Sequence, residues 1–218
     1  MKILITSGGT KVKIDLVRSI TNMSRGTFGS QICDSFWRKL ITSSDSADKN
    51  EIVFFYAKNS RMPTAESNHN YYYDTSIQAI RYIEYDTFDD YRLKLTNLLK
   101  AEKFDIIVLA AAVSDYGVAN YFNGKYHSSD DMTIKLVKLP KVITEVRALA
   151  PNATICGFKL LVNSLLMKSF VQLWTSSLLR MTSSFVLAMI CVTSKQMTIV
   201  SQSSSMRSLS LKTRLKSS

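Results

Sequence analysis

Short apolar runs alternate with amphipathic stretches along the first 160 residues of the chain. The apolar run at residues 2–6 ends at Ser7-Gly8-Gly9, which is typical of a buried parallel strand entering a loop. Apolar positions recur at helical spacing in residues 26–41 and 87–102, which predicts two helices. Residues 141–149 follow Pro140, which is typical of a helix start, and predict a third. The expected strands are residues 2–6, 51–57, 77–85, 104–112, 132–137 and 153–158.

Strands that alternate with helices predict an α/β fold, in which a mostly parallel sheet is covered by helices on both faces. Ligands of such sheets bind at the carboxyl ends of the strands. Residues 58–74 are polar and aperiodic and predict a surface loop. A chain of 218 residues fits a single domain with a sizeable core.

Composition changes this picture only near the C-terminus. Residues 1–145 hold 19 basic and 17 acidic residues, whereas the rest of the chain holds 9 basic residues and no acid. The net charge of +11 therefore comes almost wholly from a Ser/Thr-rich tail, and we expect no nucleic-acid partner. No apolar run reaches the ~18 residues of a membrane span. The irregularly spaced Cys33, Cys156 and Cys191 predict neither a metal motif nor a disulfide framework, so a cytoplasmic protein is expected.

Two candidate phosphate-binding segments lie near the N-terminus. Ser7-Gly8-Gly9-Thr10 follows the first strand and offers backbone N–H groups, although a plain tight turn explains it equally well. It is neither a GxGxxG fingerprint nor a Walker loop. Residues 18–29 carry two guanidinium groups, an amide and several hydroxyls before a helix, a setting that favours anions. The alternative is a capped loop with Ser24 as the N-cap.

A third motif, Ala110-Ala111-Ala112-Val113-Ser114-Asp115-Tyr116, follows the strand expected at residues 104–112. Small residues there leave room for a flat ligand, and Asp115 can accept hydrogen bonds from hydroxyl or amino groups. A packing site with a surface aspartate is the alternative interpretation. Lys125 lies ten residues further on in a glycine-containing loop, where an isolated lysine is ordinarily just solvated.

Together these motifs resemble the phosphopantothenoylcysteine synthetase family, the phosphopantothenate–cysteine ligases of coenzyme A synthesis. The resemblance also rests on Ile14-Asp15, Val17-Arg18, Lys138-Leu139-Pro140-Lys141 and Gly157-Phe158-Lys159-Leu160-Leu161. It covers residues 1–163 and is closest in kind to the free-standing bacterial form, which has no fused flavin decarboxylase domain. The resemblance implies a Rossmann-like single domain and a homodimer.

The resemblance also implies a reaction with small-molecule substrates. The carboxylate of 4′-phosphopantothenate attacks the α-phosphate of CTP, and L-cysteine then captures the acyl-cytidylate, with Mg²⁺ sharing the phosphate charge. The catalytic residues implied are Asn22, Lys125 and Arg18, and no metal ligand is identified. Nucleotide- and phosphate-binding positions implied by the resemblance are Gly8, Gly9, Thr10, Ser24, Gly26, Leu109, Ala110, Ala111, Asp115, Lys138, Pro140 and Phe158.

The chain departs from the family after Asn163, so we expect a ligase domain at residues 1–163 and an atypical tail at 164–218. The tail has 20 Ser or Thr among its 55 residues and no Gly, Pro, His, Asp or Glu. If the codons are assumed and the gene is read in one shifted frame, residues 166–169, 180–182 and 189–191 are each replaced by family-like segments that contain acids. The same shift serves all three segments, which suggests a frameshift. A tail of that origin would pack irregularly. The alternatives are a genuine divergent tail, an inactive remnant of the enzyme, or an NAD(P)-dependent oxidoreductase without its usual motifs.

Overall fold

The computed structural model describes residues 1–42, 50–64, 80–129, 131–162, 185–192 and 197–203. The chain divides into two compact units, Met1–Ala153 and Thr154–Ser218. The division falls ten residues before the boundary expected from the sequence.

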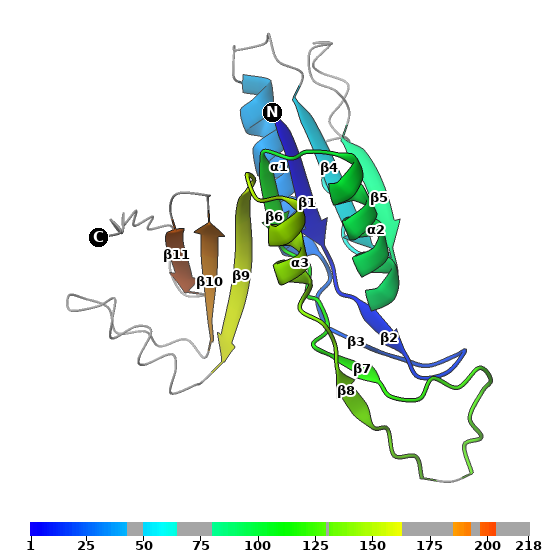
Figure 1. Ribbon diagram of the computed structural model, residues 1–218. Helices are drawn as coiled ribbons and strands as arrows, with labels where there is room; N and C mark the ends of the chain where they lie inside the picture. Colours follow the sequence, from blue (N-terminus) through cyan, green and yellow to red (C-terminus); the bar gives the residue numbers. More distant parts are fainter. Residues whose placement is uncertain (43–49, 65–79, 130, 163–184, 193–196, 204–218) are drawn as a thin grey trace. The chain divides into compact units, whose positions relative to one another are not determined.

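The first unit is built on four parallel strands in the order β6-β1-β4-β5. They are β1 (Lys2–Ser7), β4 (Glu51–Ala57), β5 (Arg81–Tyr85) and β6 (Ile106–Leu109). Helix α1 (Thr27–Thr42) covers one face, and α2 (Phe88–Ala101) and α3 (Val142–Leu149) lie over the other (Figure 1). The prediction of an α/β fold with a mostly parallel sheet is confirmed.

The strands of this sheet form where the sequence is most apolar. Ile3, Leu4 and Ile5 of β1 are fully buried because β1 has neighbours on both edges and helices on both faces. Helix α2 begins at a true cap, since the Thr87 hydroxyl accepts a hydrogen bond from the backbone N–H of Asp90. The strand expected at 77–85 is described only from residue 80, and most of the loop expected at 58–74 lies outside the described residues.

Two short antiparallel pairs extend from the unit and were only partly predicted. They are β2 (Lys11–Lys13) with β3 (Ser19–Thr21), and β7 (Tyr116–Val118) with β8 (Leu136–Lys138). We call residues 11–21 and 116–138 the arm. Apart from Gly117, the strand residues of the arm are exposed or half-buried, so they carry no clear apolar pattern in the sequence.

The second unit contains an antiparallel arrangement of β9 (Thr154–Val162), β10 (Phe185–Val192) and β11 (Met197–Ser203), with β10 in the middle. Within the expected tail, residues 185–192 and 197–203 form paired strands, and irregular packing of residues 164–218 stays a prediction. Two of the three frame-offset segments, 166–169 and 180–182, lie outside the described residues. Cys156 is disulfide-bonded, which the cysteine spacing did not predict, whereas Cys33 is buried and forms no disulfide within the described residues.

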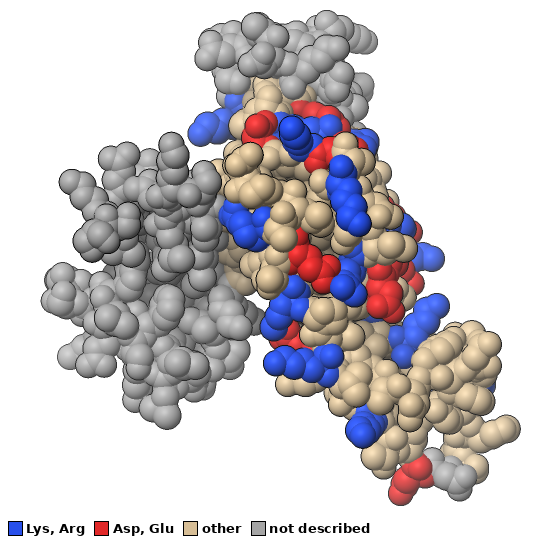
Figure 2. Space-filling view, in the orientation of Figure 1, with Lys and Arg blue, Asp and Glu red and all other residues tan. Residues whose placement is uncertain are grey.

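Charges on the first unit are mixed in sign. Figure 2 shows Lys and Arg interspersed with Asp and Glu on the face bearing α2 and α3. At the amino ends of the strands, Lys2 pairs with Glu51 and Glu102 at 2.8 and 2.7 Å, and Arg81 pairs with the same two carboxylates. No helix in the described ranges is both long and apolar enough to cross a bilayer.

An aromatic cluster under α2 fixes the carboxyl end of β1. The rings of Phe55, Tyr85 and Tyr91 lie with centroids 4.8 to 5.3 Å apart. The Tyr85 hydroxyl donates to the backbone carbonyl of Ser7 at 2.7 Å, and burial raises the pKa of that hydroxyl. This bond ties β5 to the last residue of β1, where the loop toward the candidate site begins.

We expect Tyr85→Phe to destabilise the protein by about 1 kcal/mol, the net value of one intramolecular hydrogen bond. The ring packing is retained, so the loss reports on the bond to Ser7 alone. Urea titration of the wild type, Tyr85→Phe and the exposed control Tyr121→Phe measures it. Equal midpoints for the wild type and Tyr85→Phe would show that the bond contributes nothing.

Candidate functional site

Three sequence-distant motifs meet at the backbone of Ala112, beyond the carboxyl ends of β1 and β6. The Ala112 carbonyl accepts a hydrogen bond from the N–H of Thr10 at 3.1 Å and another from the Asn22 side-chain amide at 2.8 Å. The Ala112 N–H donates to the carbonyl of Gly8 at 2.7 Å. The predicted glycine loop, the asparagine loop and the small-residue motif are therefore brought together.

The same junction is extended by hydroxyl groups. The backbone N–H of Ser114 donates to the Thr10 hydroxyl at 2.9 Å, and the two side-chain hydroxyls lie 3.0 Å apart. The Ala111 N–H donates to the Thr6 hydroxyl at 3.1 Å. Thr10 and Ser114 thus continue the β1–β6 pairing past the end of the strands, and the neighbouring Leu109, Ala110 and Ala111 are half-buried.

The glycines of the two loops are required by packing within the protein. Gly8 has φ +90°, and a Cβ there would lie 2.5 Å from the Cβ of Ala57. A Cβ on Gly9 would meet the Asn22 carbonyl at 3.0 Å. Packing within the protein thus accounts for both glycines, because protein atoms fill the space beside both Cα atoms. Contact of their backbone N–H groups with phosphate stays a prediction.

The segment before α1 is anchored on the end of β1. The Ser7 hydroxyl donates to the Gly26 carbonyl at 3.0 Å, and Gly26 has φ +75°. Helix α1 begins at Thr27, so the alternative role of Ser24 as N-cap is wrong; Ser24 is exposed three residues earlier. The exposed Ser24 hydroxyl stays available to a ligand at the amino end of the helix.

Asp15 is a buried carboxylate that the motif analysis did not select as a site residue. It accepts hydrogen bonds from the N–H groups of Val17 and Arg18 at 2.8 and 2.6 Å, from the Arg18 guanidinium at 2.7 Å, and from the N–H of Tyr126 at 3.3 Å. Burial opposes ionisation of this carboxyl group, but these donors outweigh it and lower its pKa to about 2. The only sequence signal was the Ile14-Asp15 pair quoted for the family resemblance.

Asp15 joins the Arg18 loop to the segment that carries Lys125. The Arg18 guanidinium also approaches the Tyr126 carbonyl at 3.4 Å, and the Leu16 N–H donates to the Gly124 carbonyl at 3.0 Å. Lys125 itself is exposed, and its ammonium makes no hydrogen bond or ion pair with the described part of the chain. The structure therefore holds the backbone on both sides of a lysine that is available to a ligand.

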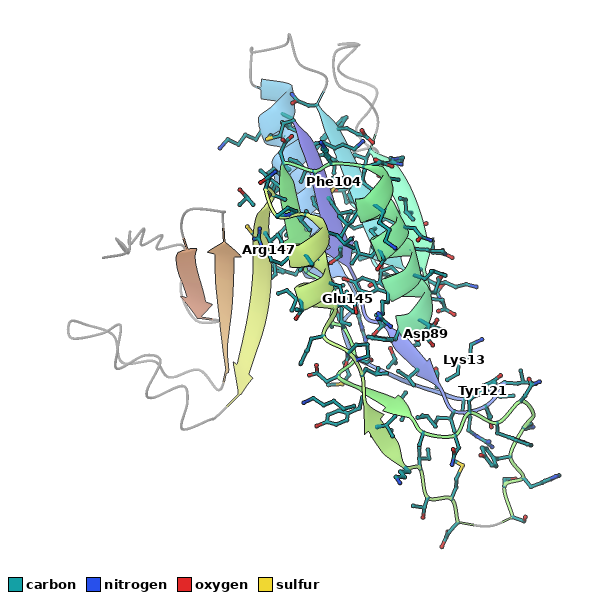
Figure 3. All side chains as sticks on the ribbon, viewed as in Figure 1. Lys13, Asp89, Phe104, Tyr121, Glu145 and Arg147 are labelled. Carbon is teal, nitrogen blue, oxygen red and sulfur yellow. The ribbon has the colours of Figure 1, made fainter. Side chains whose placement is uncertain are left out.

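The arm contains a cavity that is distinct from this junction. Its volume is about 150 Å³, and its lining includes Ile14, Val118, Tyr126 and Met132. Figure 3 marks the arm by Lys13 on β2 and Tyr121 in the loop after β7. A nucleotide needs roughly 300 Å³ or more, so the cavity is too small for one.

The remaining predicted positions lie on both units. The Leu139 N–H donates to the Asp115 carbonyl at 2.9 Å, which places the segment containing Lys138 and Pro140 beside the small-residue motif. Lys138, Pro140 and Asp115 are exposed. Phe158 lies on β9 in the second unit and is half-buried. The described residues contain no group of three His, Cys, Asp or Glu side chains able to hold a metal ion.

Comparison with known proteins gives a consistent result. Residues 1–43 and 76–213 match the family described as DNA/pantothenate metabolism flavoprotein C-terminal domain. Two relatives, each a coenzyme A biosynthesis bifunctional protein CoaBC, are 30% identical (Thermococcus kodakarensis) and 31% identical (Methanocaldococcus jannaschii), each over 72% of this chain. The chain spans about a third of their length, 34% and 33% respectively.

Solved structures share the fold. The DNA/pantothenate metabolism flavoprotein from Streptococcus pneumoniae matches this chain with a TM-score of 0.58 at 23% identity. The match covers 92% of this chain and 92% of that one. A Cab2 mutant in complex with phosphopantothenate-cysteine has a TM-score of 0.54 at 21% identity, over 71% of this chain and 62% of that one.

Asp15→Asn tests the role of the buried carboxylate. An amide cannot accept all four donors, so we expect a lower melting temperature at pH 7. The carboxylate's contribution to stability is fully present above its usual pKa of 3.8 and is lost as the pH falls through about 2. The difference in melting temperature between variant and wild type should therefore shrink from pH 4 to pH 2. The exposed control Asp131→Asn should match the wild type throughout, and a pH-independent gap for Asp15→Asn would contradict the assignment.

Proposed function

Since this chain belongs to the family described as DNA/pantothenate metabolism flavoprotein C-terminal domain, we propose that it is a phosphopantothenate–cysteine ligase of coenzyme A biosynthesis. The observation that carries the proposal is the meeting of the Gly8-Gly9-Thr10, Asn22 and Ala112 segments at one end of a parallel sheet. The names of the CoaBC relatives and the ligand of the Cab2 mutant support the same chemistry.

The proposed reaction has two steps that balance within the named substrates. A carboxylate oxygen of 4′-phosphopantothenate attacks the α-phosphorus of CTP, and pyrophosphate leaves. The amine of L-cysteine then attacks the acyl carbon, loses a proton, and expels CMP as the amide forms. Both steps move negative charge, so the chain must supply fixed cations and N–H donors where that charge develops.

The residues divide between direct contact and positioning. Lys125, with an unpaired exposed ammonium, is proposed to neutralise charge on the phosphates during activation. Arg18 is already engaged by Asp15 and the Tyr126 carbonyl, so it acts on the site by holding the Lys125 segment in place. Asn22 lies at the junction with Ala112 and is proposed to orient the acyl group for the cysteine step.

The nucleotide is proposed to lie across the carboxyl ends of β1 and β6. Its phosphates would contact Gly8, Gly9, Thr10, Ser24 and Gly26, with Lys138 adding positive charge. Its base and ribose would contact Leu109, Ala110, Ala111, Asp115 and Pro140. Mg²⁺ typically binds through phosphate oxygens and one or two carboxylates, so the family chemistry does not require a preformed protein cage for it; when bound, it would share the triphosphate charge.

Two further parts of the proposal concern the whole polypeptide. Exposed apolar side chains on the arm, such as Leu16 (63% exposed) and Val17 (67%), support a homodimer. The atypical composition after Asn163 keeps the frameshift hypothesis in place, and the nucleotide sequence across the codons for residues 155–195 decides it. A cytoplasmic location fits a biosynthetic enzyme of this kind.

Lys125→Gln tests the activation step. We expect a loss of roughly 3 kcal/mol of transition-state stabilisation, as for removal of a main charge-stabilising donor. Pyrophosphate release from CTP and phosphopantothenate measures it, with the exposed Lys103→Gln as the matched control. Release at the wild-type rate would remove Lys125 from the activation step, and absence of release by the wild type would contradict the proposed function.

Asn22→Asp separates the two steps. If Asn22 serves mainly the cysteine step, the variant should still form acyl-cytidylate yet make little product. Mass spectrometry after incubation with CTP and phosphopantothenate, with and without cysteine, detects both species. Because aspartate cannot donate to the Ala112 carbonyl, Asn22→Gln serves as a companion that keeps the amide. Normal product formation by Asn22→Asp would rule out this role.

A further inference from the structure

The second unit has no acidic side chain with which to form ion pairs. Glu145 is the last Asp or Glu of the chain, and the unit begins at Thr154. Side-chain ion pairs of the kind that Lys2 and Arg81 form with Glu51 in the first unit are therefore not open to it. The strands β9 and β10 must be held together by backbone hydrogen bonds, apolar contacts or a covalent bond.

The antiparallel ladder between β9 and β10 is closed by a chain connection at one end only. Its register runs from Val162 opposite Phe185 to Ile155 opposite Val192. Residues 163–184 connect the strands at the first of these ends, and we call the second the open end. The open end of such a ladder separates at least cost, because no connection holds its terminal hydrogen bonds together. A cross-link has its greatest effect there.

Two cysteines occupy opposite positions one residue from the open end. In the register of the ladder, Cys191 is the residue opposite Cys156. Cys156 is disulfide-bonded, and Cys33 forms no disulfide within the described residues, so Cys191 is the remaining cysteine of the chain. Residues directly opposite in an antiparallel pair have Cα atoms about 4.5 or 5.5 Å apart, and a disulfide bridges both separations. The register therefore favours Cys191 as the partner of Cys156.

The setting of this bond is that of a switch. Cys156 is half-buried, which leaves it partly accessible to an attacking thiolate. Disulfides that form in a reducing cytoplasm are usually transient and often sense the redox state. We propose that Cys156 and Cys191 form a redox-sensitive latch, a disulfide that pins the open end of the β9–β10 ladder and is released by thiol exchange. This inference rests on the cytoplasmic location proposed above and is independent of the ligase reaction.

Opening of the latch balances with two molecules of a small thiol such as glutathione. The first thiolate attacks one sulfur of the disulfide, forms a mixed disulfide with it and releases the other cysteine as a thiolate. The second thiol then displaces the protein sulfur. Two electrons and two protons pass to the protein, which gains two thiols, and the two small thiols are oxidised to one small disulfide. Closure is the reverse reaction, with that small disulfide as the oxidant.

Thiol counting on the full chain tests the pairing. The protein is equilibrated with oxidised or reduced glutathione, its free thiols are alkylated in denaturant, and the alkyl groups are counted by mass spectrometry. Because the chain has three cysteines, we expect one alkyl group in the oxidised form, at Cys33, and three in the reduced form. Peptide mapping of the oxidised form should recover Cys156 linked to Cys191. Three alkyl groups in oxidised glutathione, a link to Cys33 or a link between chains would overturn the latch.

Urea titration followed by circular dichroism measures what the latch holds. The midpoint of the oxidised wild type should lie about 1 to 2 M above that of the reduced wild type, because the cross-link lowers the entropy of the unfolded chain. Cys156→Ser and Cys191→Ser should each have the same midpoint in oxidised and reduced glutathione, whereas the control Cys33→Ser should keep the difference. The comparison of the two wild-type forms stands even where a variant fails to fold.

Two results would contradict the switch itself. Equal midpoints for the oxidised and reduced wild type would show that the bond pins nothing. A bond that stays closed at every glutathione ratio of a reducing cytoplasm would be a permanent staple, because a structural disulfide resists reduction by that pool. Neither result bears on the ligase reaction, which is tested separately by pyrophosphate release.

Discussion

The peptide group of Ala112 is the constraint on which the rest of the site depends. Its carbonyl accepts from Thr10 and Asn22, and its N–H donates to Gly8. A buried or half-buried peptide group must find partners within the protein, and here each partner belongs to a different loop position. The β1–β6 pairing is thereby carried beyond the strands, and the asparagine loop is fixed to it. Glycine at positions 8 and 9 follows from the same closeness, since side chains there would collide with Ala57 and Asn22.

The main elements were predictable because buried strands and helix faces require apolar residues at regular positions in the sequence. The apolar runs of β1, β4 and β6 and the helical spacing of α2 reflect a sheet covered on both faces. The hairpin β2–β3 left no such trace, because its three-residue strands are largely exposed and pair with each other through the backbone. The tail was expected to be irregular from its composition, yet backbone pairing joins β10 to both β9 and β11.

The candidate site was predictable in its motifs but not in its connections. The family resemblance selected Arg18 and Lys125, whereas Asp15, which links their segments, was quoted only within the Ile14-Asp15 pair and given no role. Lys141 was likewise only part of a quoted motif until its contact with Asp115 was seen. These contacts join residues 26 to 111 positions apart, so they depend on topology, which local patterns do not specify.

These long separations bear on the order in which the chain folds. The bonds from Asn22 to Ala112, Ser114 to Thr10 and Tyr126 to Asp15 join residues 90 to 111 positions apart. Contacts between residues so far apart in sequence form slowly, because the entropy of closing a large loop is lost before the contact can stabilise the chain. On the ribosome, the glycine and asparagine loops emerge long before their partners and must wait without them. The binding end of the sheet is therefore among the last parts of the unit to be assembled, and a ligand meets it only after β6 has docked beside β1.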